Sequence, residues 1–265
     1  MDSNITANQS PQQSGVESSN SRSIHTSDVR PTEHESNDSH NETLVDENRH
    51  KSEENIIKSI QLFHVFDDER GYNILFVTNR GLVYGLGSNY CGSLGLGHNY
   101  VVNSPQIIGE LCHKNITQFL IGYNFVLAFT QHNCLYGWGR NDWGQLGLEL
   151  PNMDFPFIKP ELINPKNMEN KSIYQISCGF YHTMILTSDG CVYGWGHNRY
   201  GQLGCGPDNN IRKGDTFRVN FNPYHEIKSI YCCLYSSFAI TSEGQVFSWG
   251  RNDWYNLEHN SSDNI

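Results

Sequence analysis

The chain has 265 residues, of which 18 are lysine or arginine and 28 are aspartate or glutamate, so its formal net charge is −10. This acidic balance argues against direct binding to nucleic acid, because proteins that bind phosphate backbones usually present basic surfaces. No stretch approaches the roughly 20 apolar residues of a membrane span. The polar amino terminus also lacks the basic and apolar regions of a signal peptide, so we expect no membrane partner.

Residues 1–55 differ in composition from the rest of the chain. They contain eleven acidic and four basic residues and no aromatic residue, and serine, asparagine, glutamate and histidine dominate them. Such a segment cannot bury enough apolar surface to offset the entropy of ordering, so we expect a disordered acidic tail. Its histidines are nine, six and ten residues apart, which favours a solvated tail over a local metal site: His25, His34, His40 and His50.

Residues 56–265 contain four near-copies of one short pattern, which predicts repeated supersecondary units. The copies begin at Val83, Leu135, Val192 and Val246. The aromatic residue that follows each start recurs at intervals of 52, 57 and 54 residues, at Tyr84, Tyr136, Tyr193 and Phe247. This interval exceeds helical-hairpin and leucine-rich repeats and fits a four-stranded propeller blade with its loops.

Each copy has the same order of segments, which the third shows best. An apolar segment at 173–178 precedes a second apolar run at 182–187 that ends in threonine, and a Ser-Asp-Gly turn leads into Val-Tyr-Gly-Trp-Gly at 192–196. In every copy the threonine precedes the aromatic residue by six positions, which indicates a hairpin of fixed register. The turns carry residues that readily adopt a positive φ, namely Gly81, Asn133, Gly190 and Gly244.

The glycines and leucines of the repeat indicate architecture. The glycines that flank Trp138 and Trp195 allow close backbone approach beside a large ring. A leucine recurs at one repeat position, where we expect it to fill the space between neighbouring blades: Leu94, Leu146, Leu203 and Leu257. A phosphate cradle is disfavoured, because neither a helical pattern nor a Lys-Ser/Thr pair follows the glycines, and we expect no cofactor.

The pattern resembles the repeat of the regulator of chromosome condensation family, in which Cys-Gly-x-x-His-Thr precedes x-Val-Tyr-x-Trp-Gly-x-Asn-x-x-Gly-Gln-Leu-Gly. The third copy matches almost fully, from Cys178 to Thr183 and from Val192 to Gly204. The first copy has Leu86 in place of the tryptophan, and the second and fourth have Phe125 and Ser236 in place of the histidine. The resemblance implies a β-propeller, which this family closes with seven blades.

A closer resemblance concerns the beginning of the repeat region. The first copy carries an extra segment, Asp67 to Arg70, before its second strand, and the connector Glu110 to Ile116 follows that copy. Both features are similar to the start of the propeller in proteins that join these repeats to a BTB domain.

We therefore expect an all-β fold, a partial β-propeller of about four blades preceded by the tail. The expected blades cover residues 56–108, 109–163, 164–223 and 224–265, the last incomplete. A propeller closes to hide its edge strands, so three alternatives stay open. The sequence is part of a longer protein, which we favour; an open array closes by dimerisation; or four blades close alone, unlike this family.

The loops after the Gly-Trp-Gly segments place arginine and aromatic residues at equivalent points of successive blades. These residue types are enriched in interface hot spots, and propeller loops share one rim, so we expect an interaction rim there. The alternative is that the aromatic rings pack between blades. The candidate residues are Arg140, Trp143, Arg199, Tyr200, Arg251 and Trp254.

No catalytic or metal-binding group is expected. His182 stands at a repeat position, which favours a hydrogen-bonded histidine near the central channel over a catalytic base. Ser236 and Ser237 have no histidine or aspartate at a supporting spacing, and Asp142 and Asp253 are interpreted as surface turn residues. The eight cysteines form no CxxC pair and are interpreted as buried free thiols in a reducing compartment, the cytoplasm or nucleus.

These features predict a protein–protein interaction module, the recognition part of a larger adaptor or scaffold, and not an enzyme. If the BTB resemblance holds, it implies a substrate adaptor that recruits a cullin-type ubiquitin ligase through a domain absent from this chain. The alternative that the family implies is a guanine-nucleotide exchange factor for a Ran-like small GTPase, with chromatin association. A third hypothesis is that the chain has no independent function.

Overall fold

The computed structural model describes residues 54–148, 156–165, 168, 170–206, 214–253 and 257. The chain divides into two compact units, Met1–Arg49 and His50–Ile265, and every described residue belongs to the second. Most of the predicted acidic tail and the candidate residue Trp254 therefore lie outside the described residues.

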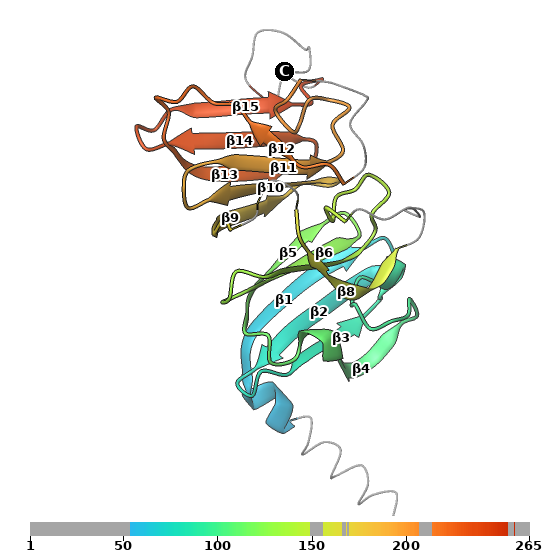
Figure 1. Cartoon of the computed structure of the whole chain (residues 1–265). Coiled ribbons are helices and arrows are strands. Elements are labelled where there is room, and N and C mark those ends of the chain that lie inside the picture. The colour runs from blue at the N-terminus through green and yellow to red at the C-terminus, as the bar shows by residue number, and fades with distance from the viewer. Residues whose placement is uncertain are drawn as a thin grey trace, which may run out of the picture. The chain divides into compact units, whose positions relative to one another are not determined.

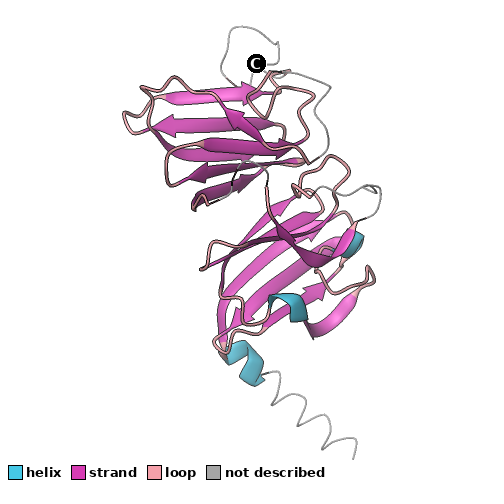
Figure 2. Cartoon of the chain, in the orientation of Figure 1, coloured by secondary structure: helices cyan, strands magenta, loops and turns pink. Residues whose placement is uncertain are grey.

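Four antiparallel sheets make up the described fold, and in each sheet the strands lie in sequence order (Figure 1). The first sheet contains β1 (Ile60–Asp68), β2 (Gly71–Thr78), β3 (Val83–Gly87) and β4 (Val102–Ile107), and the second contains β5 (Ile116–Gly122), β6 (Phe125–Thr130), β7 (Leu135–Gly139) and β8 (Phe157–Ile163). The third contains β9 (Ile173–Cys178), β10 (His182–Thr187), β11 (Val192–Gly196) and β12 (Phe217–Val219), and the fourth contains β13 (Ile227–Cys233), β14 (Ser236–Thr241) and β15 (Val246–Gly250). In the described part of the chain, helix is confined to residues 54–58 and to two short 3-10 segments, η1 (Tyr90–Gly92) and η2 (Gly109–Leu111) (Figure 2), so the predicted all-β fold is confirmed.

The hairpin between the second and third strands of each sheet has the predicted register. In the third sheet Ile185 lies opposite Tyr193 and Leu186 opposite Val192, and the Thr187 hydroxyl donates to the Cys191 carbonyl at 2.9 Å. The turn residues have φ values between 61° and 85°, at Gly81, Asn133, Gly190 and Gly244. The repeated threonine thus bonds across the hairpin, while glycine or asparagine provides the positive φ that the turn requires.

Each tryptophan of the repeat joins its sheet to the preceding sheet. The three indole rings are buried within core clusters that combine residues of two neighbouring sheets. Their N–H groups donate to backbone carbonyls of the preceding sheet: Trp138 to Ser93 at 2.8 Å, Trp195 to Gln145 at 2.9 Å and Trp249 to Gln202 at 2.9 Å. The leucines predicted to fill this space are buried, as expected: Leu94, Leu146, Leu203 and Leu257.

A buried asparagine fixes the loop that follows the third strand of each sheet. Its Oδ1 accepts the backbone N–H of the leucine five residues later, in the pairs Asn89–Leu94, Asn141–Leu146, Asn198–Leu203 and Asn252–Leu257. The constant spacing of five residues from this asparagine to the leucine is therefore a structural requirement of the loop.

Candidate interaction surface

Two sets of loops meet at one end of the sheets. One set joins the first strand to the second, and the other follows the third strand. Backbone hydrogen bonds connect the first set from sheet to sheet, since Tyr123 N donates to Phe180 O at 3.0 Å and Phe180 N donates to Leu234 O at 2.8 Å. Others connect the two sets, including His197 N to Tyr181 O at 2.8 Å. The loops of the second, third and fourth sheets thus form one continuous surface.

The side chains of this surface are mainly aromatic, with arginines among them. We call it the loop surface and define it by Tyr123, Phe180, Tyr181, Leu234 and Tyr235 from the first set of loops, and Arg140, Trp143, Arg199, Tyr200 and Arg251 from the second. Neighbouring ring centroids lie 5.3 to 5.8 Å apart in the pairs Tyr123–Phe180, Tyr123–Tyr181, Phe180–Tyr235, Tyr181–Tyr235 and Tyr200–Tyr235. These distances are typical of favourable aromatic pairs, so the rings support one another while remaining partly exposed.

The structure brings five of the six candidate rim residues onto this surface. Arg140 and Arg251 each form an ion pair with the aspartate two residues later, Asp142 and Asp253. The Arg251 guanidinium also lies over two rings, 5.0 Å from the Tyr200 centroid and 5.4 Å from that of Tyr235. Arg199 is exposed.

The sequence left two alternatives for these aromatic residues, exposure on an interaction rim or packing between blades, and Trp143 does both. It contacts His197 of the next sheet edge-on, with centroids 4.5 Å apart, and yet 44% of its surface is exposed. A binding role for the rim residues stays a prediction.

Sequence reasoning missed the aromatic residues of the first set of loops. Tyr123 and Phe180 stand seven positions before the terminal threonine of their copies, and Tyr181 and Tyr235 stand six positions before it. An aromatic residue that recurs at a fixed offset just outside a strand is a signal for a shared surface, and the offset could have revealed it.

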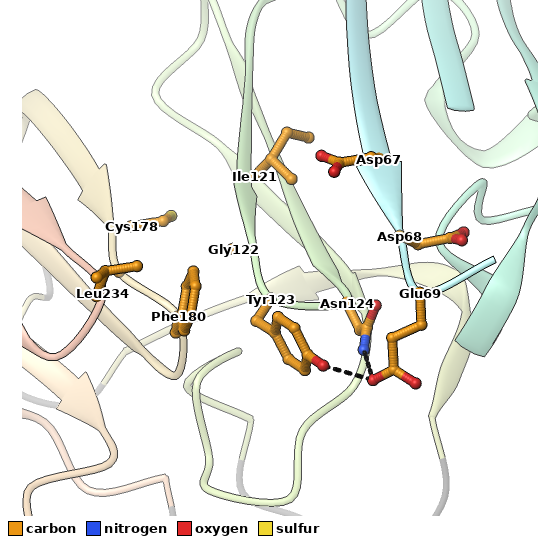
Figure 3. Close-up of a pocket in the computed structure, with 11 residues that line it drawn as sticks. Asp67, Asp68, Glu69, Ile121, Gly122, Tyr123, Asn124, Cys178, Phe180 and Leu234 are labelled. Atoms are coloured by element: carbon orange, nitrogen blue, oxygen red, sulfur yellow. Dashed lines mark hydrogen bonds between the residues drawn. The ribbon is translucent and has the colours of Figure 1, made fainter. Parts of the chain in front are cut away.

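The acidic loop between β1 and β2 adjoins this surface. Glu69 Oε1 accepts hydrogen bonds from Tyr123 Oη at 2.6 Å and from Asn124 Nδ2 at 3.2 Å (Figure 3). The Tyr123 bond is the largest effect holding the pKa of the Glu69 carboxyl below its ordinary value, and it raises the pKa of Tyr123 to about 12. Glu69 is therefore a fixed, ionised carboxylate.

Asp68, in contrast, serves the loop itself. Its carboxylate accepts hydrogen bonds from the backbone N–H groups of Arg70, Gly71 and Tyr90 at 2.8 to 3.1 Å, and from the side chains of Asn73 and Ser88, both at 2.7 Å. Burial alone raises the pKa of the Asp68 carboxyl, but these bonds outweigh it and lower the pKa. The extra segment of the first copy is thus organised around Asp68.

A cavity of about 370 Å³ lies where the first loops of the four sheets converge (Figure 3). Asp67, Asp68 and Glu69 line one side of it, and Tyr123, Phe180 and Leu234 are among the residues that line the rest. Its described lining contains no lysine, arginine or histidine. The cavity is therefore acidic on one side and largely aromatic or aliphatic on the other.

His182 is a buried, hydrogen-bonded histidine, as predicted, but the spacing argument about the serines was wrong. His182 Nε2 lies 2.9 Å from Ser237 Oγ, because adjacent sheets bring together residues that are 55 positions apart. The Ser237 hydroxyl donates to the Gln202 carbonyl at 2.8 Å, so the proton between the pair belongs to His182 Nε2. Burial, followed by the nearby His197, lowers the pKa of His182 to about 3. Both side chains are fully buried, which leaves the hydroxyl no access to a substrate from solvent.

The described residues contain no group of three or more side chains able to hold a metal ion. Within the same residues no helix is long and apolar enough to cross a membrane. None of the eight cysteines, all of which lie in the described residues, forms a disulfide. Cys205 and Cys233 are exposed and the other six are only partly buried, so the prediction of buried thiols was wrong for the first two and is met only in part by the others.

The sequence model of the "Regulator of chromosome condensation (RCC1) repeat" matches residues 80–129, 132–186 and 189–240, and a second model of that repeat matches residues 173–202. The chain belongs to the RCC1 repeat family. The predicted resemblance is thereby confirmed, and the closer link to the BTB-joined subgroup stays a prediction.

Relatives of this RCC1-repeat chain are longer proteins. The "Ultraviolet-B receptor UVR8" of Arabidopsis thaliana is 33% identical over 175 residues, 66% of this chain and 38% of that protein. The "E3 ubiquitin-protein ligase HERC2" of Homo sapiens is 27% identical over 217 residues, 79% of this chain and 4% of that protein. The chain thus spans well under half of either relative.

Among solved structures, human WBSCR16 has a TM-score of 0.63 at 27% identity, with 77% of this chain and 51% of that chain covered. Prp20p of Saccharomyces cerevisiae has a TM-score of 0.62 at 24% identity, with 78% of this chain and 49% of that chain covered, a likeness that concerns the fold alone. The sheets described above are therefore RCC1-type propeller blades.

Proposed function

We propose that this chain is a protein-interaction module that binds its partner through the loop surface. The observation that carries the proposal is the set of partly exposed tyrosine, phenylalanine, tryptophan and arginine side chains that three successive sheets contribute to one continuous surface. These side chains are held by neighbouring rings and by backbone bonds between loops, so they lose little conformational freedom on binding.

The relatives support a role in binding other proteins. Prp20p is described with binding properties to Gsp1p and histones, and yeast RCC1 has been solved bound to Kap60. HERC2 and HERC4 are named as E3 ubiquitin-protein ligases, and this chain matches a part of each. We infer that the chain acts as the recognition part of a larger adaptor or scaffold, while the cullin partner rests on the BTB resemblance alone.

We further infer that the chain is not an enzyme. The histidine and serine that the sheets bring together, His182 and Ser237, are buried, and their shared proton lies on the histidine, so the pair is arranged as a structural hydrogen bond. The loop surface presents aromatic rings and ion-paired arginines, which suit recognition better than proton transfer.

The proposal is tested by comparing which proteins are captured from cells by the wild-type chain and by paired tyrosine variants. Tyr181→Ala and Tyr235→Ala remove rings from the loop surface. Tyr174→Ala, a matched control, removes a tyrosine that is 68% exposed on β9. Partners identified by mass spectrometry should be lost with the first two variants and retained with the third. Equal loss or equal retention across all three variants would contradict the proposed surface.

The exchange-factor alternative requires a separate measurement. The chain at micromolar concentration is mixed with a Ran-like small GTPase that carries a fluorescent guanine nucleotide, and the rate of nucleotide release is followed. The interaction-module proposal expects no acceleration, whereas acceleration that Tyr181→Ala abolishes would favour exchange activity through the same surface.

A further inference from the structure

The cavity beside the loop surface carries acidic residues, which packing of the aromatic rings does not require. We propose that this cavity receives a lysine or arginine side chain from the protein segment that docks on the loop surface. The inference rests on the proposed function and adds to it the chemical class of the anchoring residue. Its basis is the arrangement of carboxylates, rings and apolar side chains around the cavity (Figure 3).

Two carboxylates define the acidic side. The Asp67 carboxylate is directed toward Ile121, across the cavity, and Asp67 is exposed (Figure 3). Glu69 is held by Tyr123 and Asn124, so a cation would find this carboxylate already in position. Asp68 also borders the cavity, but its carboxylate is directed away from it and accepts the hydrogen bonds of its own hairpin (Figure 3).

Two arginines stand near these carboxylates, but both have other partners. Arg70, which follows Glu69 in the chain, lies over the Tyr90 ring. Arg140, the arginine whose charge acts on Glu69, is ion-paired with Asp142. The described lining of the cavity adds no basic residue of its own. A cationic side chain would therefore complement the cavity, whereas an acidic segment or a phosphate would be repelled.

The remaining walls suit the rest of a lysine or arginine side chain. Tyr123 and Phe180 offer ring faces, which attract an ammonium or guanidinium group through the ring quadrupole. Leu234, 51% exposed, and Ile121 offer apolar contact for the methylene stem of such a side chain. The same surface already holds one guanidinium against rings, that of Arg251 over Tyr200 and Tyr235.

The size of the cavity is also suitable for one anchoring side chain. Its volume of about 370 Å³ lies near the lower end of the range, about 300–1,000 Å³, that small-ligand sites occupy. A single long side chain with part of its backbone fits such a volume. The aromatic loop surface would then bind the flanking residues of the segment.

An oriented peptide library tests the inference with the full chain. The probe is a pool of peptides with degenerate flanks and a central lysine, arginine, norleucine or glutamate, and the pool retained on the immobilised chain is sequenced. We expect lysine or arginine to be enriched about tenfold over norleucine and glutamate to be depleted. One cation–π contact and one charge pair together can contribute the free energy that corresponds to a tenfold ratio.

Two variants separate the cavity from the rest of the surface. The double variant Asp67→Asn/Glu69→Gln keeps hydrogen-bonding groups but removes both charges, and it should lower the enrichment severalfold, to what the ring contacts alone provide. The matched control Asp253→Asn removes a carboxylate that pairs with Arg251 outside the cavity lining, and it should leave the enrichment unchanged. Thermal unfolding of each variant checks that the fold persists.

The outcomes distinguish this inference from the proposed function. If the chain binds peptides in a manner that Tyr181→Ala abolishes but shows no preference for lysine or arginine, the cavity inference is wrong and the interaction surface stands. The same holds if the preference is undiminished in the double variant. If the chain retains no peptide and captures no partner through the loop surface, both are wrong.

Discussion

Phe63 in the first sheet and Phe119 in the second occupy the same repeat position. Phe63 pairs with Phe76 and Phe119 pairs with Ala128, and both partners stand two residues before the threonine that ends their strand. Phe63 is 66% exposed, whereas Phe119 is only 4% exposed. The equivalent residues of the third and fourth sheets, Ile176 and Ile230, are 6% and 1% exposed. The first sheet therefore differs from the other three at a position where all four sequences are apolar.

The difference arises from what lies in front of each sheet. Phe119 belongs to the core cluster that also contains Trp138 and residues of the first sheet, so a preceding sheet covers it. On the first sheet, register places Phe63, Phe76, Tyr84 and Ile107 in one row across four strands. The first sheet covers the equivalent row of the second sheet, but among the described residues no sheet covers this row of the first. Within this row Phe76 and Tyr84 stack on each other and are only 3% and 8% exposed, whereas Phe63 and Ile107 are 66% and 53% exposed. The repeat thus determines which face is apolar, while a neighbouring sheet determines whether the outer strands of that face are buried as well.

The largest effect expected from this comparison concerns the two phenylalanines. Phe119→Ala should lower the free energy of unfolding by about 3–5 kcal/mol, because it removes a ring from a packed interface and leaves a cavity. Phe63→Ala should lower it by less than about 1 kcal/mol, because the exposed ring already contacts solvent. Urea denaturation of both variants measures the difference. Equal losses would mean that the row on the first sheet is covered in solution.

A second substitution examines a feature that the sheets share. Asn198→Ala removes the acceptor for Leu203 N and the donor to Gly206 O, and Asn89→Ala removes the acceptor for Leu94 N and the donor to His98 O. Each change leaves a buried backbone N–H without its partner, so each should cost about 1–3 kcal/mol. Urea denaturation should give a loss for each variant, and a larger one for Asn89→Ala, because Asn89 has a φ of 56°, which alanine adopts less readily than asparagine. A loss confined to one sheet would show that the loops are not equivalent.

A third prediction uses the histidine position, which holds His182 in the third sheet and Asn73 in the first. The pKa of folded His182 is about 3, because burial disfavours its charged form, and its unfolded pKa is about 6.5. As pH falls below about 6.5 only the unfolded state takes up the proton, so stability is lost progressively down to about pH 3. Between pH 7 and pH 5 this group should remove about 2 kcal/mol.

The variant His182→Asn isolates that contribution. Its unfolding free energy should fall by about 2 kcal/mol less than that of the wild type between pH 7 and pH 5. His197, whose pKa burial lowers to about 4, changes stability with the same sign and remains in the variant. An unchanged slope for His182→Asn would mean that the folded histidine takes up a proton near neutral pH.

Much of this fold could be predicted from particular residues. The constant offset between Thr187 and Tyr193, repeated in every copy, predicted the register of the hairpins. The recurring leucines predicted which residues are buried between neighbouring sheets. Contacts between copies were not accessible in this way. The approach of His182 to Ser237 depends on how two sheets pack, and linear spacing carries no information about that distance.

The candidate surface shows the same limit. The loops after the third strand were identified, because arginine and tryptophan recur in them. The cavity could not be identified in this way, because its lining combines the extra segment of the first copy with Tyr123 of the second copy and Phe180 of the third. A feature that differs between copies is hidden from reasoning based on what the copies share.

The smallest expected effect compares arginines stacked on rings in the first and fourth sheets. Arg70 lies 4.5 Å from the Tyr90 centroid, and Arg251 lies over Tyr200 and Tyr235. Because Arg70 is exposed and the Arg251 side chain is 34% exposed, Arg70→Ala and Arg251→Ala should each lower the free energy of unfolding by less than about 1 kcal/mol, and less at high salt. Denaturation at low and high ionic strength measures this. A loss above about 2 kcal/mol for Arg251→Ala would show that the stacked arginine holds the loop surface together, and weaker partner binding by that variant would then reflect a disordered surface instead of a lost contact.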